Sequence, residues 1–320
     1  MGGSKPGEGD EAGTRPKGRE AGGLLRDHAD ARRVGANETG AGPPDTADRH
    51  AIVALDPDHP GFRDPEYRAR RNRIAAMALE YRPGGILPEA PYTAEEHRLW
   101  RTIREALAPV HGCDACAEYL EALRRLDLPS ERIPQLREVS ERIESLSGFR
   151  LEPVAGLVEP SAFLESLADG VFLCTQYIRH HSTPFYTPEP DVMHEVLGHA
   201  ATLASPRFAR LNRLVGEAVR RTSSAGELER LAHVYWFTLE FGVVREEGRV
   251  KAYGTGLLSS VGELDAMSRA VLLPLNLDGA SRTEYDPTHY QPRLFCAESF
   301  DAMESSLAGF LHAWPSSVQS

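Results

Sequence analysis

Two histidines five residues apart, His194 and His199, lie in the segment TPEPDVMHEVLGH (187–199). A glutamate, Glu240, follows in the aromatic-rich segment YWFTLEF (235–241). Two imidazoles and one carboxylate form the ligand set of mononuclear non-haem Fe(II) oxygenases, in which they occupy one face of the metal and leave the other face open. These residue types therefore predict a metal centre with room for dioxygen.

The spacing of the histidines constrains the backbone that carries them. In the HExxH motif of zinc proteases the histidines are four apart, about 40° around a helix, whereas five residues subtend about 140°. His194 and His199 can reach one ion only if His194 lies at the helix entrance or Gly198 relaxes the turn. The spacing disfavours a zinc hydrolase with Glu195 as its base. Spacing alone leaves open that the two histidines merely pack or cap a helix.

Further motifs follow one another in order: DHPGF (58–62), DPEYRARR (64–71), IPQL (133–136), FRLEPVAGL (149–157), CTQYIRH (174–180), KAYGTGLLSS (251–260) and ESF (298–300). Together with the histidine segment, they resemble the tetrahydropterin-dependent aromatic amino acid hydroxylases over about four-fifths of the chain. The resemblance implies one catalytic domain, mainly α with a small β element. It also implies Fe(II) and tetrahydrobiopterin or a related tetrahydropterin as cofactors, with O2 as co-substrate.

The resemblance assigns roles to individual residues. His194, His199 and Glu240 match the iron ligands, and Arg179 matches the residue that holds the substrate carboxylate through a bidentate fork. Asp191 could orient that guanidinium. Matches to positions lining the amino acid pocket are Thr187, Pro190, Trp236, Gly256 and Ser259. The indole of Trp236 offers a flat wall for an aromatic ring, a role that does not exclude ordinary core packing.

The pterin site is implied by the resemblance alone, since the residues by themselves form an ordinary apolar loop. The matching positions are Gly156, Leu157, Val158, Phe163, Ala232 and Tyr235. Phe163 would stack on the pterin ring, and the backbone near Leu157 would bind its edge. Glu195 matches a glutamate that positions the pterin through water; its alternative is a solvated charge on a helix.

Free phenylalanine is the expected substrate and tyrosine the expected product. A phenylalanine ring has no hydroxyl to desolvate in an apolar pocket. The loop 282–291, in which Pro287 stands about where tyrosine-preferring members carry an acid, also favours phenylalanine. Ala201 departs from the proline of most relatives, so hydroxylation at the meta carbon remains an alternative, as do tyrosine and tryptophan as substrates. A non-catalytic protein that binds aromatic amino acids is an alternative of another class.

Composition limits the partners. A net charge of −11 argues against nucleic acid as a main partner, because phosphate binding requires clustered Lys and Arg. No apolar run reaches the length of a membrane span, and no apolar leader opens the chain. We therefore expect a cytoplasmic enzyme. The chain stops soon after Trp314 with no heptad run, which indicates a monomer or a homodimer.

Four cysteines are too few for a disulfide framework in 320 residues. Cys113 and Cys116 form a CxxC pair, but a zinc site would also require Cys174 and Cys296 to come together. Reduced, partly buried thiols are the expectation.

The first fifty residues contain eleven glycines and four prolines among mixed charges, and no aromatic residue precedes Phe62. Such a segment cannot bury enough apolar surface to offset its chain entropy, so residues 1–50 should be a disordered tail. The catalytic domain is expected over 51–316, with a short tail at 317–320.

Helices must position the site residues. Thr93 and Glu96 predict a capping box that opens a helix running through Trp100 and Ile103. Apolar periodicity predicts helices over 115–126 and 136–146, and a long aromatic-rich helix over 228–244. Strands are expected over 171–178 and 250–253. There is no βαβ alternation and no glycine-rich phosphate loop, which disfavours nucleotide-binding folds.

Overall fold

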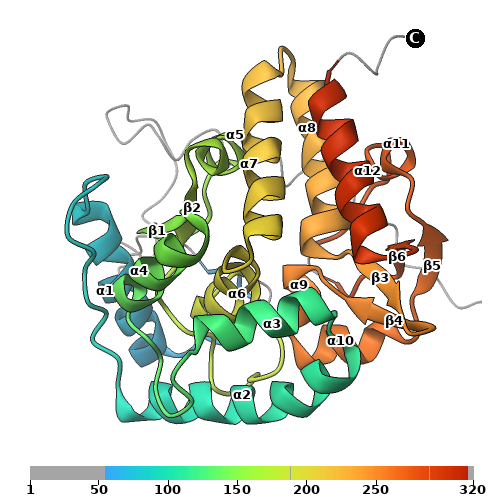
Figure 1. Cartoon of the computed structure of the whole chain (residues 1–320). Helices are drawn as coiled ribbons and strands as arrows, with labels where there is room; N and C mark the ends of the chain where they lie inside the picture. Colours follow the sequence, from blue (N-terminus) through green and yellow to red (C-terminus); the bar gives the residue numbers. More distant parts are fainter. Residues whose placement is uncertain (1–54, 188, 288, 316–320) are drawn as a thin grey trace, which may run out of the picture. The chain divides into compact units, whose positions relative to one another are not determined.

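A computed structural model describes residues 55–187, 189–287 and 289–315 of the chain. Within this part helices predominate and the strands form two small sheets, as Figure 1 shows. The mainly α fold class with a small β element is therefore confirmed. The predicted tails at 1–50 and 317–320 lie outside the described residues, so the division into tails and one catalytic domain stays a prediction.

Four helices precede the first sheet, and two of them begin at well-formed caps. They are α1 (Pro65–Glu80), α2 (Ala94–Asp114), α3 (Ala117–Leu126) and α4 (Leu136–Ser147). Thr93 Oγ1 accepts the N–H of Glu96, whose carboxylate accepts the N–H of Thr93, so the predicted capping box is present. The apolar face of α2, with Trp100, Ile103 and Leu107, is fully buried in the main hydrophobic core.

The described strands form two sheets, one from the middle of the chain and one from its last third. Strands β1 (Arg150–Pro153) and β2 (Val171–Cys174) pair in parallel. The second sheet has the order β4-β3-β6-β5, with β3 and β4 antiparallel and the other pairs parallel. Its strands are β3 (Val243–Glu246), β4 (Arg249–Ala252), β5 (Val271–Pro274) and β6 (Arg293–Ala297).

The remaining described helices follow β1, and two of them carry the predicted metal ligands. They are α5 (Pro160–Ser166), the short 3₁₀ turn η2 (Leu167–Asp169), η3 (His194–Ala200), α6 (Ala201–Leu203), α7 (Pro206–Arg221), α8 (Ala225–Tyr235), η4 (Trp236–Glu240), α9 (Thr255–Leu258), α10 (Val261–Met267), α11 (Leu277–Ala280) and α12 (Phe300–Ala313). Helices α7, α8 and α12 lie side by side (Figure 1), and α7 also contacts α5 and η2.

The close approach of α7 to η2 depends on a glycine. A Cβ added at Gly216 would lie 2.2 Å from the backbone nitrogen of Ala168, a contact that no L side chain tolerates. The small residue therefore allows the helix to pack directly on the segment that leads into β2.

Two predicted elements end earlier than expected. The strand predicted over 171–178 stops at Cys174, and the helix predicted over 228–244 stops at Glu240, after which Val243 begins β3. The apolar pattern of the sequence does not mark the ends at Cys174 and Glu240. Buried residues follow both positions, and they pack in the core without extending the strand or the helix. The helices predicted over 115–126 and 136–146 match α3 and α4 closely, and the strand predicted over 250–253 matches β4.

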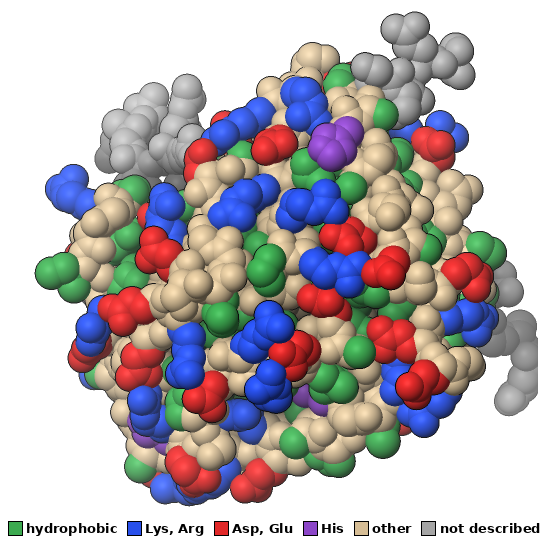
Figure 2. Space-filling model, in the orientation of Figure 1, with side chains coloured by type: hydrophobic (Ala, Val, Ile, Leu, Met, Phe, Trp, Pro, Cys, Tyr) green, Lys and Arg blue, Asp and Glu red, His purple; other side chains and the backbone are tan. Residues whose placement is uncertain are grey.

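Charge on the described surface is mixed. Figure 2 shows acidic and basic side chains interspersed on one face. The described residues also form many ion pairs, including Arg207 with Glu118 and Arg210 with Glu304. Among the described residues, no helix combines the length and apolar character that crossing a membrane requires. All four cysteines are free thiols, three of them buried, and they form no metal-binding group with one another.

Candidate active site

Both segments that carry the predicted metal ligands are π-helical. In η3 and η4 the backbone hydrogen bonds run from residue i to i+5, a rare pattern that occurs frequently at functional sites. The wider turn brings His194 and His199 to one side, and His194 is the first residue of η3. The expected relaxation of the turn is therefore present. A Cβ at Gly198 would lie 2.9 Å from the Thr255 carbonyl oxygen, so glycine lets α9 pack against η3.

The structure brings the three predicted ligands together. The Nε2 atoms of His194 and His199 are 2.9 Å apart. His199 Nε2 lies 3.0 Å from Glu240 Oε1, and His194 Nε2 lies 3.9 Å from Glu240 Oε2. One ligand atom from each residue falls within 4.8 Å of the others. The arrangement is that of a single metal site built from the ends of two π-helices.

Hydroxyl groups from α9 and the residue after it hold the ligands in place. Ser259 Oγ lies 2.9 Å from His194 Nδ1, and Thr255 Oγ1 donates to Glu240 Oε2 at 2.7 Å. Ser259 Oγ is also 3.4 Å from the Gly256 carbonyl, to which it can donate while accepting from Nδ1–H. That pattern selects the imidazole tautomer whose Nε2 lone pair faces the metal position.

The electrostatics of the three ligands suit a cation. Burial lowers the pKa of His194 to about 4, helped by the neighbouring His199, so its imidazole is neutral at pH 7. Burial alone would raise the pKa of Glu240, but the two histidines and the hydrogen bonds from His199 and Thr255 lower it to about 2. The site therefore presents a carboxylate and at least one neutral imidazole, the protonation states that metal binding requires.

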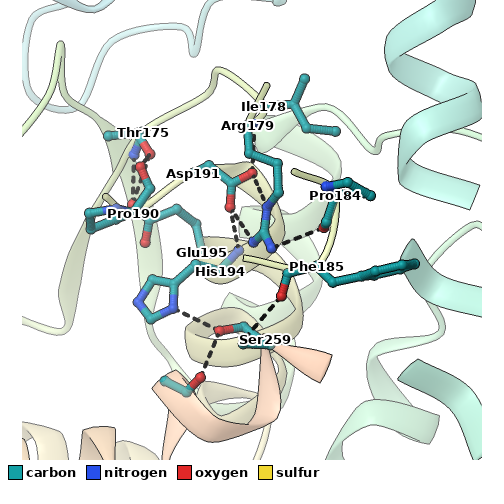
Figure 3. Close-up of polar contacts among 12 residues, drawn as sticks. Thr175, Ile178, Arg179, Pro184, Phe185, Pro190, Asp191, His194, Glu195 and Ser259 are labelled. Carbon is teal, nitrogen blue, oxygen red and sulfur yellow. Dashed lines mark hydrogen bonds and ion pairs between the residues drawn. The ribbon is translucent and has the colours of Figure 1, made fainter. Parts of the chain in front are cut away.

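Arg179 and Asp191 form a buried ion pair close to His194 (Figure 3). Arg179 donates from Nε to Asp191 Oδ2 at 2.9 Å and from Nη2 to Oδ1 at 2.7 Å, with side-chain exposures of 2% and 1%. Asp191 Oδ2 also accepts the backbone N–H of Arg179 at 2.8 Å. The expectation that Asp191 orients Arg179 is thus met. The Nη1–Nη2 edge of the guanidinium is left facing away from Asp191.

Glu195 is buried and turned toward β2 instead of solvent. One of its oxygens accepts both the backbone N–H and the hydroxyl of Thr175 at 3.0 Å (Figure 3). Burial raises the pKa of Glu195 to about 7 in spite of these bonds. The alternative of a solvated helix charge is therefore wrong.

The predicted pocket residues lie on three segments around this site. Thr187 and Pro190 are half-buried in the stretch before η3, and the Pro190 carbonyl accepts from Thr175 Oγ1 at 3.3 Å. A Cβ at Gly256 would lie 2.5 Å from the Phe241 ring, so that ring packs directly on the glycine. Ser259, expected to line the pocket, also contacts the predicted metal ligand His194.

Trp236 belongs to an aromatic stack. Tyr285 stacks on its indole at 4.0 Å with an interplanar angle of 10°, and Phe241 lies against it at 4.6 Å. Its Nε1 donates to Gln291 Oε1 at 3.2 Å. The indole is therefore packed against Phe241, which follows η4, and against Tyr285 of the loop 282–291.

The predicted pterin-binding residues come from the β1–α5 loop, α5 and α8. Leu157 is 61% exposed at the loop, whereas Gly156 is buried. Phe163 packs edge-on against Phe172 at 5.2 Å and against Tyr235 at 6.0 Å. Val158 and Ala232 are half-buried on the loop and on α8.

Phe172 connects this aromatic group to the metal site, because its ring lies 4.3 Å from the His199 imidazole. Sequence reasoning did not single out Phe172, Thr175 or Thr255. Thr255 lies inside a motif that carried the family resemblance, but a threonine offers no residue-type signal for its bond to a glutamate fifteen positions earlier.

The biopterin-dependent aromatic amino acid hydroxylase family matches residues 49–318. The phenylalanine 3-hydroxylase of Streptomyces coeruleorubidus is 45% identical over 79% of this chain and 90% of the relative. The phenylalanine-4-hydroxylase of Bos taurus is 43% identical over 82% of this chain, but the match spans only 59% of that enzyme.

A solved structure shares the fold. The phenylalanine hydroxylase of Chromobacterium violaceum, crystallised with iron(III) and 7,8-dihydrobiopterin, is 25% identical with a TM-score of 0.67, over 87% of this chain and 95% of that one. The family match covers the described site and most of the remaining sequence. This chain therefore belongs to the biopterin-dependent aromatic amino acid hydroxylases.

Proposed function

We propose that this chain hydroxylates free phenylalanine to tyrosine, using Fe(II), a tetrahydropterin and O2. The observation that carries the proposal is the double role of Asp191. Its carboxylate holds the Arg179 guanidinium and also accepts the backbone N–H of His194 at 3.2 Å. The group proposed to bind the substrate carboxylate and the first metal ligand are thereby held in one geometry, which favours catalysis by orientation.

His194, His199 and Glu240 would hold the iron. Metal–nitrogen distances near 2.1 Å place neighbouring ligand atoms about 3 Å apart, which agrees with the 2.9 Å and 3.0 Å separations here. Two imidazoles and one carboxylate leave further coordination positions for small molecules. The donor set therefore fits Fe(II).

Arg179 would bind the carboxylate of the amino acid. A guanidinium has two edges that can each form a bidentate pair, and Asp191 occupies the Nε–Nη2 edge. The Nη1–Nη2 edge would bind the substrate carboxylate; in this structure Nη1 donates a long hydrogen bond, 3.4 Å, to the Pro184 carbonyl. Thr187, Pro190, Trp236 and Gly256 would surround the aromatic ring.

The β1–α5 loop would hold the pterin. Phe163 offers a flat apolar surface, and exposed Leu157 leaves its backbone accessible for hydrogen bonds to the pterin edge. Glu195, buried and held by Thr175, would position the pterin through water. Bound iron and pterin would together supply electrons and activated oxygen, while the chain fixes the orientation of the ring.

A second candidate is hydroxylation at the meta carbon. The Streptomyces relative, which the chain matches over 90% of its length, is a 3-hydroxylase. Ala200, the last residue of η3, and Ala201, the first of α6, are fully buried, and the proline expected at the second position is absent. A small shift of the ring relative to the metal ligands would suffice for this outcome.

The test is anaerobic Fe(II) reconstitution of the full chain, followed by a pterin-dependent oxygen assay with phenylalanine, tyrosine and tryptophan. Chromatography of the phenylalanine reaction against tyrosine and meta-tyrosine standards then identifies the product. A dominant meta-tyrosine peak would overturn the ring position and keep the metal assignment. Faster turnover of tryptophan or tyrosine would overturn the substrate.

Family membership overturns the two alternatives from other classes, a zinc hydrolase and a non-catalytic binding protein. The expectation of a monomer or homodimer remains a prediction for light scattering, where a tetramer would contradict it. Cytoplasmic location also remains a prediction.

A further inference from the structure

A second group of potential metal ligands lies immediately after Arg179. His180 Nε2 is 3.2 Å from Asp64 Oδ2, and one nitrogen of His181 lies within 4.8 Å of both ligand atoms. The group shares no residue with the His194–His199–Glu240 site. We propose that Asp64, His180 and His181 form a second cation site, which binds Zn²⁺ or a similar ion that prefers imidazole.

Asp64 is positioned by its role as the N-cap of α1. Its Oδ1 accepts the backbone N–H groups of Glu66 and Tyr67, both at 3.0 Å. The cap fixes the carboxylate and directs Oδ2 toward His180. The hydrogen bonds from Tyr67 and His180 lower the pKa of Asp64, so the carboxylate is charged at neutral pH.

His180 is held just as firmly. Its imidazole is buried, its ring packs edge-on against Tyr67 at 5.0 Å, and its Nδ1 lies 2.7 Å from Ser182 Oγ. The backbone N–H of Ser182 also approaches Nδ1, at 3.3 Å, so binding of a cation at Nε2 requires the ring proton to move to Nδ1, from which it can be donated to the Ser182 hydroxyl. A partner of this kind on the second ring nitrogen is typical of histidines that bind metals.

The presence of His181 distinguishes a metal site from a simple hydrogen bond between His180 and Asp64. The contact between His180 and Asp64 needs no third residue, yet the exposed ring of His181 lies only 4.3 Å from that of His180. Because an exposed side chain changes rotamer readily, the remaining distance can close around an ion about 2.1 Å from each ligand. Water would complete the coordination on the solvent side.

This second site lies next to Arg179 in the chain. His180 directly follows Arg179, and Asp64 begins α1, so a bound ion would tie the segment that leads from Arg179 toward Asp191 to a separate helix.

The experiment titrates Zn²⁺ into the full chain already loaded with one equivalent of Fe(II), anaerobically and against a chromophoric chelator, while released iron is measured. We expect one further equivalent of zinc to bind without release of iron. His181→Ala and Asp64→Asn should each abolish it; asparagine preserves the helix cap. Ser182→Ala should weaken the affinity for this zinc ion by about tenfold.

Two further variants separate this site from the iron site. His194→Ala should lose iron and still bind the zinc equivalent, and His312→Ala, a change at an exposed histidine on α12, should behave as the unaltered chain. The proposal is overturned if no zinc binds beyond the iron equivalent, if zinc only displaces iron, or if both His181→Ala and Asp64→Asn retain it. Because zinc binding is measured directly, the result is independent of whether phenylalanine is the substrate.

Discussion

Replacing Asp191 with asparagine should damage both stability and substrate binding. The side chain is almost isosteric, but its loss of charge leaves the Arg179 guanidinium buried without a counter-ion. Removing one partner of a buried ion pair costs about 3–5 kcal/mol. Asp191 also accepts two backbone N–H groups, from Arg179 and His194, so the loss should lie toward the upper end of that range.

Urea unfolding followed by circular dichroism measures the change, with the midpoint shift converted by linear extrapolation. At 2–4 °C per kcal/mol for a domain near this size, a thermal scan should show a melting temperature lower by roughly 6–20 °C. Asp265→Asn is the matched control, because it breaks the ion pair with Arg269 in which both side chains are mostly exposed. That change should cost at most about 1 kcal/mol.

The double variant Arg179→Met/Asp191→Leu separates stability from binding. A buried ion pair replaced by apolar residues of similar volume is often neutral or stabilising, so this variant should recover most of the stability. The KM for phenylalanine should nevertheless stay high, because the guanidinium is absent. The reasoning fails if Asp191→Asn costs no more than Asp265→Asn, or if it destabilises the fold and leaves the KM for phenylalanine unchanged.

Three further changes test other contacts. Ser259→Ala should weaken Fe(II) affinity by about 10–100-fold, measured by chelator competition, because His194 Nδ1 loses its partner. Glu263→Gln should stabilise the fold at pH 8 and much less at pH 5, measured by urea unfolding at both values, with about 3 kcal/mol as the upper bound. Gly216→Ala should lower the melting temperature strongly, since its Cβ would collide with the Ala168 backbone.

The sign of the Glu263 effect follows from its burial. The side chain is only 8% exposed, and desolvation raises its pKa to about 7 from 4.5. The folded state therefore holds a proton that the unfolded state has released, so stability falls as pH rises from about 4.5 through 7. Equal effects of Glu263→Gln at both pH values would contradict this. Unchanged iron affinity in Ser259→Ala, or a native melting temperature in Gly216→Ala, would contradict the other two predictions.

The grouping of the three predicted metal ligands could be expected from sequence because their residue types and the surrounding motifs are specific. The five-residue spacing of His194 and His199 even indicated that the turn could not be a regular α-helix, and η3 is a π-helix. The end of the helix at Glu240 was missed because the buried residues of β3 continue the apolar run.

The hydrogen bonds that support these residues could not be predicted from the sequence. Ser259 and His194 are 65 residues apart, and Thr175 and Glu195 are 20 apart, so their pairing depends on how α9 and β2 pack against η3. Neither threonines nor serines carry a spacing signal for such contacts. The same holds for the approach of His181 to Asp64, which exists only after α1 has packed beside residue 180.

The most direct measurement is the iron content of the reconstituted chain beside those of His194→Ala, His199→Ala and Glu240→Ala, each checked for native circular dichroism. The account predicts one equivalent of Fe(II) with pterin-dependent phenylalanine hydroxylation in the unaltered chain. It predicts loss of both in every variant that keeps its fold. Stoichiometric iron with full activity in any one of the three would remove that residue from the metal site and contradict the account.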